Sequence, residues 1–163
     1  CFGGRAGAGS TISVCTAYKN TGHGIYAESG STISGCTAYN NTLDGVNAES
    51  GCTISGCTAS FNTGDGIQVS GDSQLTGNTC DSNGSGGDGA GIYVTGSQNR
   101  IDSNNVTDND RGIDVDSTGN LIIRNSASGN TTNYDIVAGN KDAQVLSPGS
   151  GFVSTHPLAN VRF

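Results

Sequence analysis

The chain has few of the residues that fill a thick globular core. Its 163 residues include no Trp, no Met and only two Pro, and 33% are hydrophobic, whereas 27 are Gly. Any core must be thin and regular, because scattered apolar side chains could not offset the entropy lost on ordering the chain. No stretch approaches the roughly 20 apolar residues that cross a bilayer, so no membrane span is expected.

Positive charge is also scarce. Seven Lys and Arg against 14 Asp and Glu give a formal net charge of −7. A chain of this charge is repelled by phosphate backbones and anionic headgroups, so nucleic acid is not an expected partner. The first residues, CFGGRAG, lack a start Met and the hydrophobic run of a signal peptide. The chain is therefore expected to be a mature form or a fragment.

What the chain does have is a repeat of 21 residues. Segments 9–29, 30–50 and 51–71 are near copies of one another, and the third reads GCTISGCTASFNTGDGIQVSG. A first apolar anchor recurs at Ile12, Ile33, Ile54, Leu75, Ile101 and Ile122. A second anchor recurs at Ile25, Val46, Ile67, Ile92, Ile113 and Ile136. Repeats of this length are typical of solenoids.

Within each unit, apolar and polar residues alternate, as in Ile113-Asp114-Val115, and this period of two predicts short strands. Stacked about 4.8 Å apart, equivalent strands of successive coils would place like residues in inward columns. One column changes type, running Cys15, Cys36, Cys57, Asn78, Asn104, Asn125. Another is Asn throughout: Asn20, Asn41, Asn62, Asn83, Asn109, Asn130. An Asn amide can bond to its copy in the next coil, which favours parallel, in-register stacking.

These units resemble the right-handed parallel β-helix repeats of the pectate-lyase-like superfamily, whose coils read Ile-x-x-Asn-x-apolar-x-x-Asn followed by Gly-Ile-x-Val. The likeness runs from about residue 9 to 139. It implies an all-β, single-stranded, right-handed parallel β-helix of about six to seven coils, in an extracellular or cell-surface bacterial protein. We expect coils over 1–139, with a truncated first coil and an insertion at 84–91. Residues 140–163 would form the last partial coil and a C-terminal cap.

The six cysteines raise the question of disulfides. Equivalent cysteines of neighbouring coils would lie within reach, but in-register parallel strands hold their Cβ atoms side by side and would strain the bond. A ladder of buried free thiols is therefore favoured over bridges. Zinc is not expected, because Cys52 and Cys57 have no CxxC partner or neighbouring His. The GxGxxG match at 84–89 has no following helix, so it predicts a loop and not a dinucleotide site.

The strand after the Gly-Ile anchor carries the candidate binding residues on its outward face. They are Tyr26, Glu28, Asn47, Glu49, Gln68, Tyr93 and Asp114. Aromatic rings stack on sugar rings, while carboxylates and amides bond to hydroxyls. In the superfamily that the repeat resembles, this strand commonly lines a glycan groove. A structural or carbohydrate-binding role is the leading hypothesis, with a polysaccharide or cell-surface glycan as partner.

Catalysis on the same face is the alternative. Asp114 and Asp116 on one strand, about 7 Å apart, or Glu28 and Glu49 on adjacent coils, about 5 Å apart, fit the separation that glycoside hydrolysis requires. Any acidic, solvated face produces such pairs, so a protein without enzymatic activity is preferred. The two histidines, His23 and His156, are isolated in the sequence and suggest no catalytic triad.

A polysaccharide lyase would need an Arg or Lys base beside carboxylates that bind calcium. Only Arg111 offers this combination, with Asp108 and Asp110 before it and Asp114 and Asp116 after it. Arg111, Asp114 and Asp116 are thus the candidate catalytic residues. No cofactor is expected, although calcium at Asp108 and Asp110 is possible.

Two further surfaces suggest a third class of function. A Thr-x-Ser array repeats at Thr11/Ser13, Thr32/Ser34, Thr53/Ser55 and Gln74/Thr76. Regular Thr residues on a flat solenoid face can order water, so ice binding is conceivable, although Thr and Ser are also ordinary residues of an exposed strand. An open first coil would expose strand edges, which predicts self-association through the coil ends.

Overall fold

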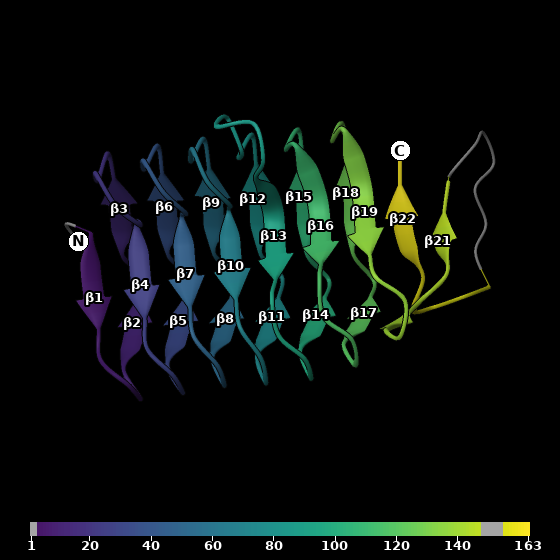
Figure 1. Ribbon diagram of the computed structural model, residues 1–163, viewed down its shortest axis with the longest axis horizontal. Coiled ribbons are helices and arrows are strands. Elements are labelled where there is room, and N and C mark those ends of the chain that lie inside the picture. The colour runs from purple at the N-terminus through teal and green to yellow at the C-terminus, as the bar shows by residue number, and fades with distance from the viewer. Residues whose placement is uncertain (1–2, 148–154) are drawn as a thin grey trace.

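The computed structural model describes residues 3–147 and 155–163, whose chain winds through three sheets. Figure 1 shows the coils side by side along the long axis, from β1 (Gly4–Ala6) at one end to β22 (Asn160–Arg162) and β21 (Val145–Leu146) at the other. Every strand pairing of the described residues is parallel. The predicted all-β parallel solenoid is confirmed. The described residues contain no helix that could span a membrane.

Each coil contributes one short strand to each sheet. Sheet A consists of β1, β4 (Ile25–Ala27), β7 (Val46–Ala48), β10 (Ile67–Val69), β13 (Ala90–Val94), β16 (Arg111–Val115) and β19 (Thr132–Ile136). Sheet B consists of β2 (Thr11–Ser13), β5 (Thr32–Ser34), β8 (Thr53–Ser55), β11 (Gln74–Thr76), β14 (Arg100–Asp102), β17 (Leu121–Ile123) and β20 (Lys141–Asp142). Sheet C runs β21, β22, β18 (Ser126–Ser128), β15 (Asn105–Thr107), β12 (Thr79–Asp81), β9 (Thr58–Ser60), β6 (Thr37–Tyr39) and β3 (Thr16–Tyr18).

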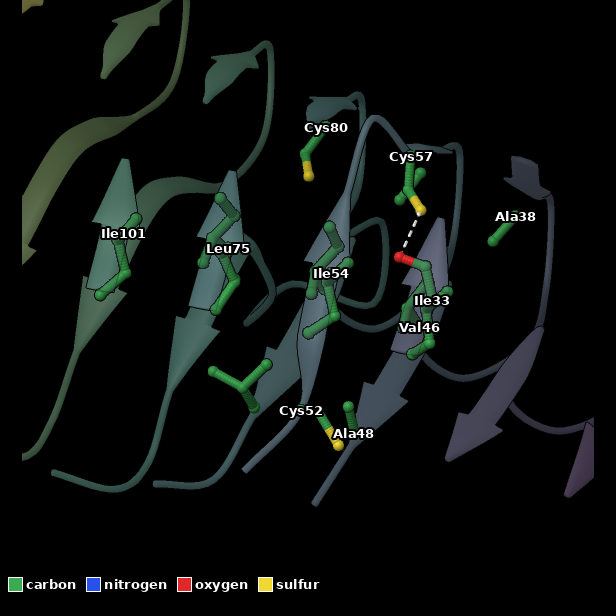
Figure 2. Packing of buried hydrophobic residues seen from close by; sticks show 14 of the residues in the cluster. Ile33, Ala38, Val46, Ala48, Cys52, Ile54, Cys57, Leu75, Cys80 and Ile101 are labelled. Atoms are coloured by element: carbon green, nitrogen blue, oxygen red, sulfur yellow. Dashed lines mark hydrogen bonds between the residues drawn. The ribbon is translucent and has the colours of Figure 1, made fainter. Parts of the chain in front are cut away.

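The core lies between the three sheets and is built from the predicted columns. Ile33, Ile54, Leu75 and Ile101 follow one another from coil to coil (Figure 2), and all four are fully buried. Because a strand places alternate residues on opposite faces, a strand of three residues buries either its middle residue or its two ends. In β5 the middle residue is buried, whereas in β7 the ends are buried and the middle faces outward.

Four cysteines, Cys36, Cys52, Cys57 and Cys80, are buried free thiols, in agreement with the predicted thiol ladder. Burial raises the pKa of Cys57 to about 11. Cys15 is different, because it is disulfide-bonded, so the free-thiol prediction is wrong there. The expected strain applies to a disulfide between equivalent cysteines of neighbouring coils. Cys15 directly precedes β3, which is the edge strand of sheet C. Cys1 lies outside the described residues.

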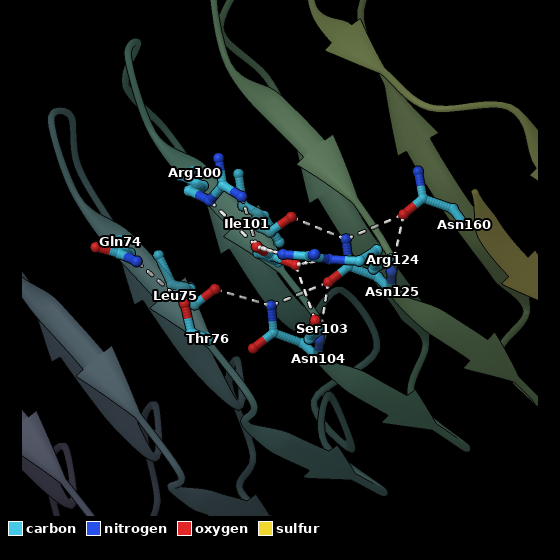
Figure 3. A network of polar contacts seen from close by, with 11 residues as sticks. Gln74, Leu75, Thr76, Arg100, Ile101, Ser103, Asn104, Arg124, Asn125 and Asn160 are labelled. Atoms are coloured by element: carbon cyan, nitrogen blue, oxygen red, sulfur yellow. Dashed lines mark hydrogen bonds and ion pairs between the residues drawn. The ribbon is translucent and has the colours of Figure 1, made fainter. Parts of the chain in front are cut away.

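Asparagine ladders close the turns between the strands. Asn62 Oδ1 accepts bonds from the backbone N–H of Asn41 at 3.0 Å and from its Nδ2 at 2.8 Å. The same pattern links Asn78 to Asn104 and Asn104 to Asn125. Figure 3 shows the bond between Asn104 and Asn125. A ladder that the sequence did not reveal follows sheet A and runs Ser73, Asn99, Asn120, Asn140. From Asn99 onward, side-chain amides therefore hold all three turns, whereas Ser and Cys side chains take two of these positions in the earlier coils.

The last coil receives its strand from the C-terminal segment. Strand β22 lies between β18 and β21, so the chain returns to sheet C after the residues that follow β21. Asn160 Oδ1 accepts bonds from Asn125 N at 2.9 Å and from Asn125 Nδ2 at 3.1 Å, which extends the ladder across 35 residues. Phe152 and Val153, expected in the cap, lie outside the described residues.

The Thr-x-Ser array lies in register on sheet B and ends at a cluster of charges. Asp102 is 3% exposed and is held by Arg100 and Arg124, both of which Figure 3 labels. Arg124 Nε donates to Asp102 Oδ1 at 2.7 Å, and Arg100 donates to Oδ2 at 2.8 Å. Hydrogen bonding to Arg124 is the main reason that the pKa of Asp102 is lowered to about 2. The flat Thr surface thus stops where these longer side chains begin.

Candidate functional site

The outward residues of sheet A form the column that the repeat predicts. Strand pairing aligns Tyr26 with Asn47, Asn47 with Gln68 and Gln68 with Tyr93, and the column continues through Asp114. A polar and aromatic strip therefore runs along the solenoid axis, with one residue from each coil.

The two tyrosines of this strip are each fixed by a carboxylate of the following coil. Tyr26 donates its hydroxyl to Glu49 Oε1 at 2.7 Å, and Tyr93 donates to Asp116 Oδ2 at 2.9 Å. The bond to Asp116 is the main reason that the pKa of Tyr93 is raised to about 12, and the bond from Tyr26 lowers the pKa of Glu49. Arg5 lies over the Tyr26 ring at 5.2 Å. Both rings are half-buried and held in one orientation.

The amides between the tyrosines are also ordered before any ligand arrives. Asn47 Nδ2 donates to Gln68 Oε1 at 2.7 Å and to Asp44 Oδ2 at 2.8 Å. At the start of the strip, Glu28 pairs with Arg5 at 2.6 Å. Side chains that are already oriented lose less entropy when they bind, which favours recognition along this face.

Asp114 does not face solvent, so that part of the prediction is wrong. It is 1% exposed, because Arg111 folds over it and bonds to its carboxylate while also pairing with Asp88. Asp88 belongs to the insertion before β13, which brings a second carboxylate to Arg111. Burial raises the pKa of Asp114, whereas the bond to Asp114 is the main cause of the raised pKa of Arg111. A guanidinium with a raised pKa is a poor base.

The other calcium candidates lie in the turn before β16. Asp108 and Asp110 line a hollow of about 390 Å³ together with Asn83 and Ser85 from the insertion side. Within residues 3–147 and 155–163, no group of three or more His, Cys, Asp or Glu side chains is arranged to hold a metal ion. Asp116 accepts the Tyr93 hydroxyl, whereas Arg111 pairs with Asp114 and Asp88.

A second column beside the strip was missed. It consists of the residues that precede the glycine of the second anchor, His23, Asp44, Asp65, Ala90 and Arg111. His23 is not isolated: its Nδ1 lies 3.1 Å from Asp44 Oδ2. Asp44 Oδ1 accepts from Asp65 N at 2.9 Å, and Asp65 Oδ1 accepts from Ala90 N at 2.6 Å. The signal was available, because all these residues share one phase of the repeat.

Asp65 has the most altered acidity on this face. Burial is the main cause, and the neighbouring Asp44 and Asp114 add to it, so the pKa rises to about 7 from its ordinary value of 3.8 although Ala90 N–H and Arg111 oppose the shift. Near neutral pH about half of these carboxyls carry a proton. Asp65 can therefore act both as a hydrogen-bond donor and as an acceptor toward a bound molecule.

This acidity predicts a pH-dependent stability. A carboxyl with a raised pKa in the folded state contributes stability that is complete below its unfolded value near 3.8 and is lost as pH rises through about 7. We expect the free energy of unfolding of Asp65→Asn to depend less on pH than that of the wild type between about pH 4 and 8. Urea unfolding across this range measures it. The control, Asp72→Asn in an exposed turn, should follow the wild type, and parallel curves for all three proteins would contradict the prediction.

The parallel coils and the 21-residue repeat define a β-solenoid, and comparison with known proteins shows its family. Residues 4–148 match the family described as right handed beta helix region, so the chain belongs to this family and is a right-handed β-helix. Among solved structures it is similar to the A-module of a mannuronan C-5 epimerase from Azotobacter vinelandii, with a TM-score of 0.66 and 14% identity. The match covers 98% of this chain and 53% of that module, so the chain spans about half its length. No curated protein matches the sequence.

Proposed function

We propose that this protein binds an extended polysaccharide along the outward face of sheet A, at the cell surface or outside the cell. The observation that carries the proposal is the pair of tyrosines, Tyr26 and Tyr93, whose hydroxyls are fixed to carboxylates at 2.7 and 2.9 Å. Each fixed ring is partly exposed and can contact a sugar, and the carboxylates have further lone pairs for sugar hydroxyls.

The direction of the strip suits a linear chain. Equivalent residues repeat with each coil along the solenoid axis, so an extended glycan lying on the strip would meet Tyr26, Asn47, Gln68 and Tyr93 in turn. The similar epimerase module is named for an action on mannuronan, which supports a polysaccharide as the ligand class. Because the face itself carries Glu28, Glu49 and Asp116, we expect an acidic glycan to bind only with a cation such as calcium, and a neutral glycan to need none.

Tyr93→Ala is the sharpest test of this proposal. We expect affinity for the bound glycan to fall by roughly tenfold, because the stacking face is removed. Affinity electrophoresis against neutral and acidic polysaccharides, with and without calcium, identifies the ligand, and calorimetry then measures the dissociation constant. Tyr93→Phe keeps the ring and should retain most of the affinity. Thr53→Ala, on sheet B, should bind as the wild type does, whereas equal affinity in Tyr93→Ala would contradict the proposal.

Enzymatic turnover on the same face is the second candidate, and Asp65 is the observation that favours it. A carboxyl with a pKa of about 7 is suited to give a proton to a leaving oxygen near neutral pH. Asp44 provides a second carboxylate from the adjacent coil, about 5 Å away along the axis. Incubation of the protein with the same polysaccharides tests this candidate, and the release of new sugar ends would support turnover over binding alone.

A further inference from the structure

Sheet B carries a group of positive charges on a chain that is acidic as a whole. Arg100 lies on β14, Arg124 directly follows β17, and Lys141 lies on β20, so the three residues come from three successive coils. Strand pairing places Arg100, Leu121 and Lys141 in one outward column, with Arg124 in the turn beside it. We call Arg100, Arg124 and Lys141 the cationic cluster.

The positive charge of the cluster is only partly neutralised. Arg100 Nη2 and Arg124 Nη2 both bond to the same oxygen, Asp102 Oδ2, so one carboxylate serves two guanidinium groups. The opposite arrangement holds on sheet A, where the single Arg111 meets two carboxylates. Among the described residues, Asp102 is the only acidic side chain that pairs with the cationic cluster. The cluster therefore keeps an excess of positive charge.

The strands around the cluster supply no second carboxylate on the outward face. The outward positions of β17, between Arg100 and Lys141, are the apolar residues Leu121 and Ile123. On the other side, β11 presents the uncharged Gln74 and Thr76. Asp142 is aligned with Ile122, which belongs to the inward phase of the strand. An anion that approaches this face meets the cations across an apolar gap, where their attraction is less weakened than in open water.

The two arginines are held in place while part of each guanidinium stays available. Asp102 is 3% exposed and also accepts a bond from Ser103 Oγ at 2.8 Å, so the carboxylate that anchors both arginines is itself fixed. The Arg100 and Arg124 side chains are 42% and 43% exposed. In the part of the chain that the structure describes, neither Nη1 group donates a hydrogen bond. These donors are oriented before a ligand binds, which lowers the entropy cost of binding.

We propose that the cationic cluster is a binding site for a tetrahedral oxyanion, a sulfate or phosphate group. A phosphate group brings about two negative charges and three acceptor oxygens, which suits two arginines and a lysine better than the single charge of another carboxylate. Gln74 and Thr76 of the adjacent coil can bond to hydroxyls of a molecule that carries the group. This inference does not rest on the sheet A proposal, because the two surfaces belong to different sheets.

Calorimetry on the full chain at constant ionic strength tests the site. The probes are sodium sulfate, sodium phosphate, sulfated glucose and phosphorylated glucose, with sodium acetate as the planar anion. We expect at least one tetrahedral anion to bind roughly tenfold more tightly than acetate. Arg100→Gln should weaken this binding by roughly tenfold, because it removes one guanidinium and leaves Arg124 to hold Asp102. Lys19→Gln, which removes one positive charge beside sheet C, should stay within about twofold of the wild type.

Lys141→Gln is a second variant that leaves the bonds to Asp102 intact, and we expect it to weaken binding by about threefold. A thermal unfolding midpoint near that of the wild type shows that each variant is folded. Tighter binding of the sugar esters supports a glycan-borne group, whereas equal binding of the inorganic ions supports a free anion at the same site. No binding by any tetrahedral anion, acetate binding as tight as theirs, or equal losses in Arg100→Gln and Lys19→Gln would overturn the inference.

Discussion

Gly66→Ala is expected to cost roughly 4 kcal/mol of stability or to prevent folding, since overpacking here meets fixed groups. A Cβ at Gly66 would lie 2.5 Å from the carbonyl oxygen of Gly91 and 2.8 Å from Asn83 Nδ2. The carbonyl belongs to the adjacent strand, and Asn83 Nδ2 is held by Ala59 O at 3.0 Å. Neither group can move without breaking the ladder. Urea unfolding followed by circular dichroism measures the loss.

Gly22→Ala is the matched control for this substitution. An added Cβ at Gly22 meets nothing within 4 Å. We expect its free energy of unfolding to stay within about 0.5 kcal/mol of the wild type, as is usual for surface changes. If Gly66→Ala were equally mild, the coils could not be packed as tightly as the structure shows, and the close approach of Gly66 to Gly91 would be wrong.

The repeat made most of the fold predictable. Once Ile33, Ile54 and Leu75 share a phase, parallel stacking is the arrangement that buries them all in one column. The third ladder escaped because its members differ in type: Ser73 gives way to Asn99 and then Asn120. Their common property is an oxygen that accepts the N–H of the coil before. A comparison of residue types does not show this shared property, whereas a comparison of side-chain hydrogen-bond acceptors does.

The position of Asn160 had no comparable signal. It extends the ladder from Asn125, yet the connection between them does not keep the repeat spacing. A residue can complete a periodic column after any length of chain if its strand fits the open edge. The repeat therefore predicts that an Asn of the next coil bonds to Asn125, but it does not predict which Asn in the C-terminal segment does so.

For the candidate site, the sequence predicted which residues align but not which are covered. The register alone places Tyr26, Asn47, Gln68 and Tyr93 in one column. The burial of Asp114 depends on how far the Arg111 side chain reaches and on where the insertion carries Asp88, and neither follows from a repeat.

The contact between His23 and Asp44 follows from the same register that aligned the strip. The sequence hides it, because the residue before the anchor glycine changes type from coil to coil, from His23 to Asp44 and Asp65 and then to Ala90. Both side chains stand one position ahead of that glycine, so stacking in register brings them together.

Asn104→Ala is expected to lower the free energy of unfolding by about 3 kcal/mol, because it strands several buried polar groups at once. Asn104 Oδ1 accepts from Asn78 N and Asn78 Nδ2, both at 3.0 Å. Its Nδ2 donates to Leu75 O at 3.1 Å and to Asn125 Oδ1 at 3.0 Å. The site is 1% exposed, so water cannot readily replace the lost bonds. Equilibrium urea unfolding provides the measurement.

Asn105→Ala is the control that distinguishes the loss of the buried ladder bonds from the loss of any Asn amide. Asn105 is the next residue, but its side chain is exposed and accepts one bond, from Ser126 Oγ at 2.6 Å. We expect a change within about 0.5 kcal/mol, because solvent can hydrate both groups. Equal losses at the two positions would mean that strand propensity, and not the ladder, sets the cost. A loss confined to Asn104 would show that the buried amides hold one coil to the next, so that each outward surface keeps the alignment from which its function is proposed.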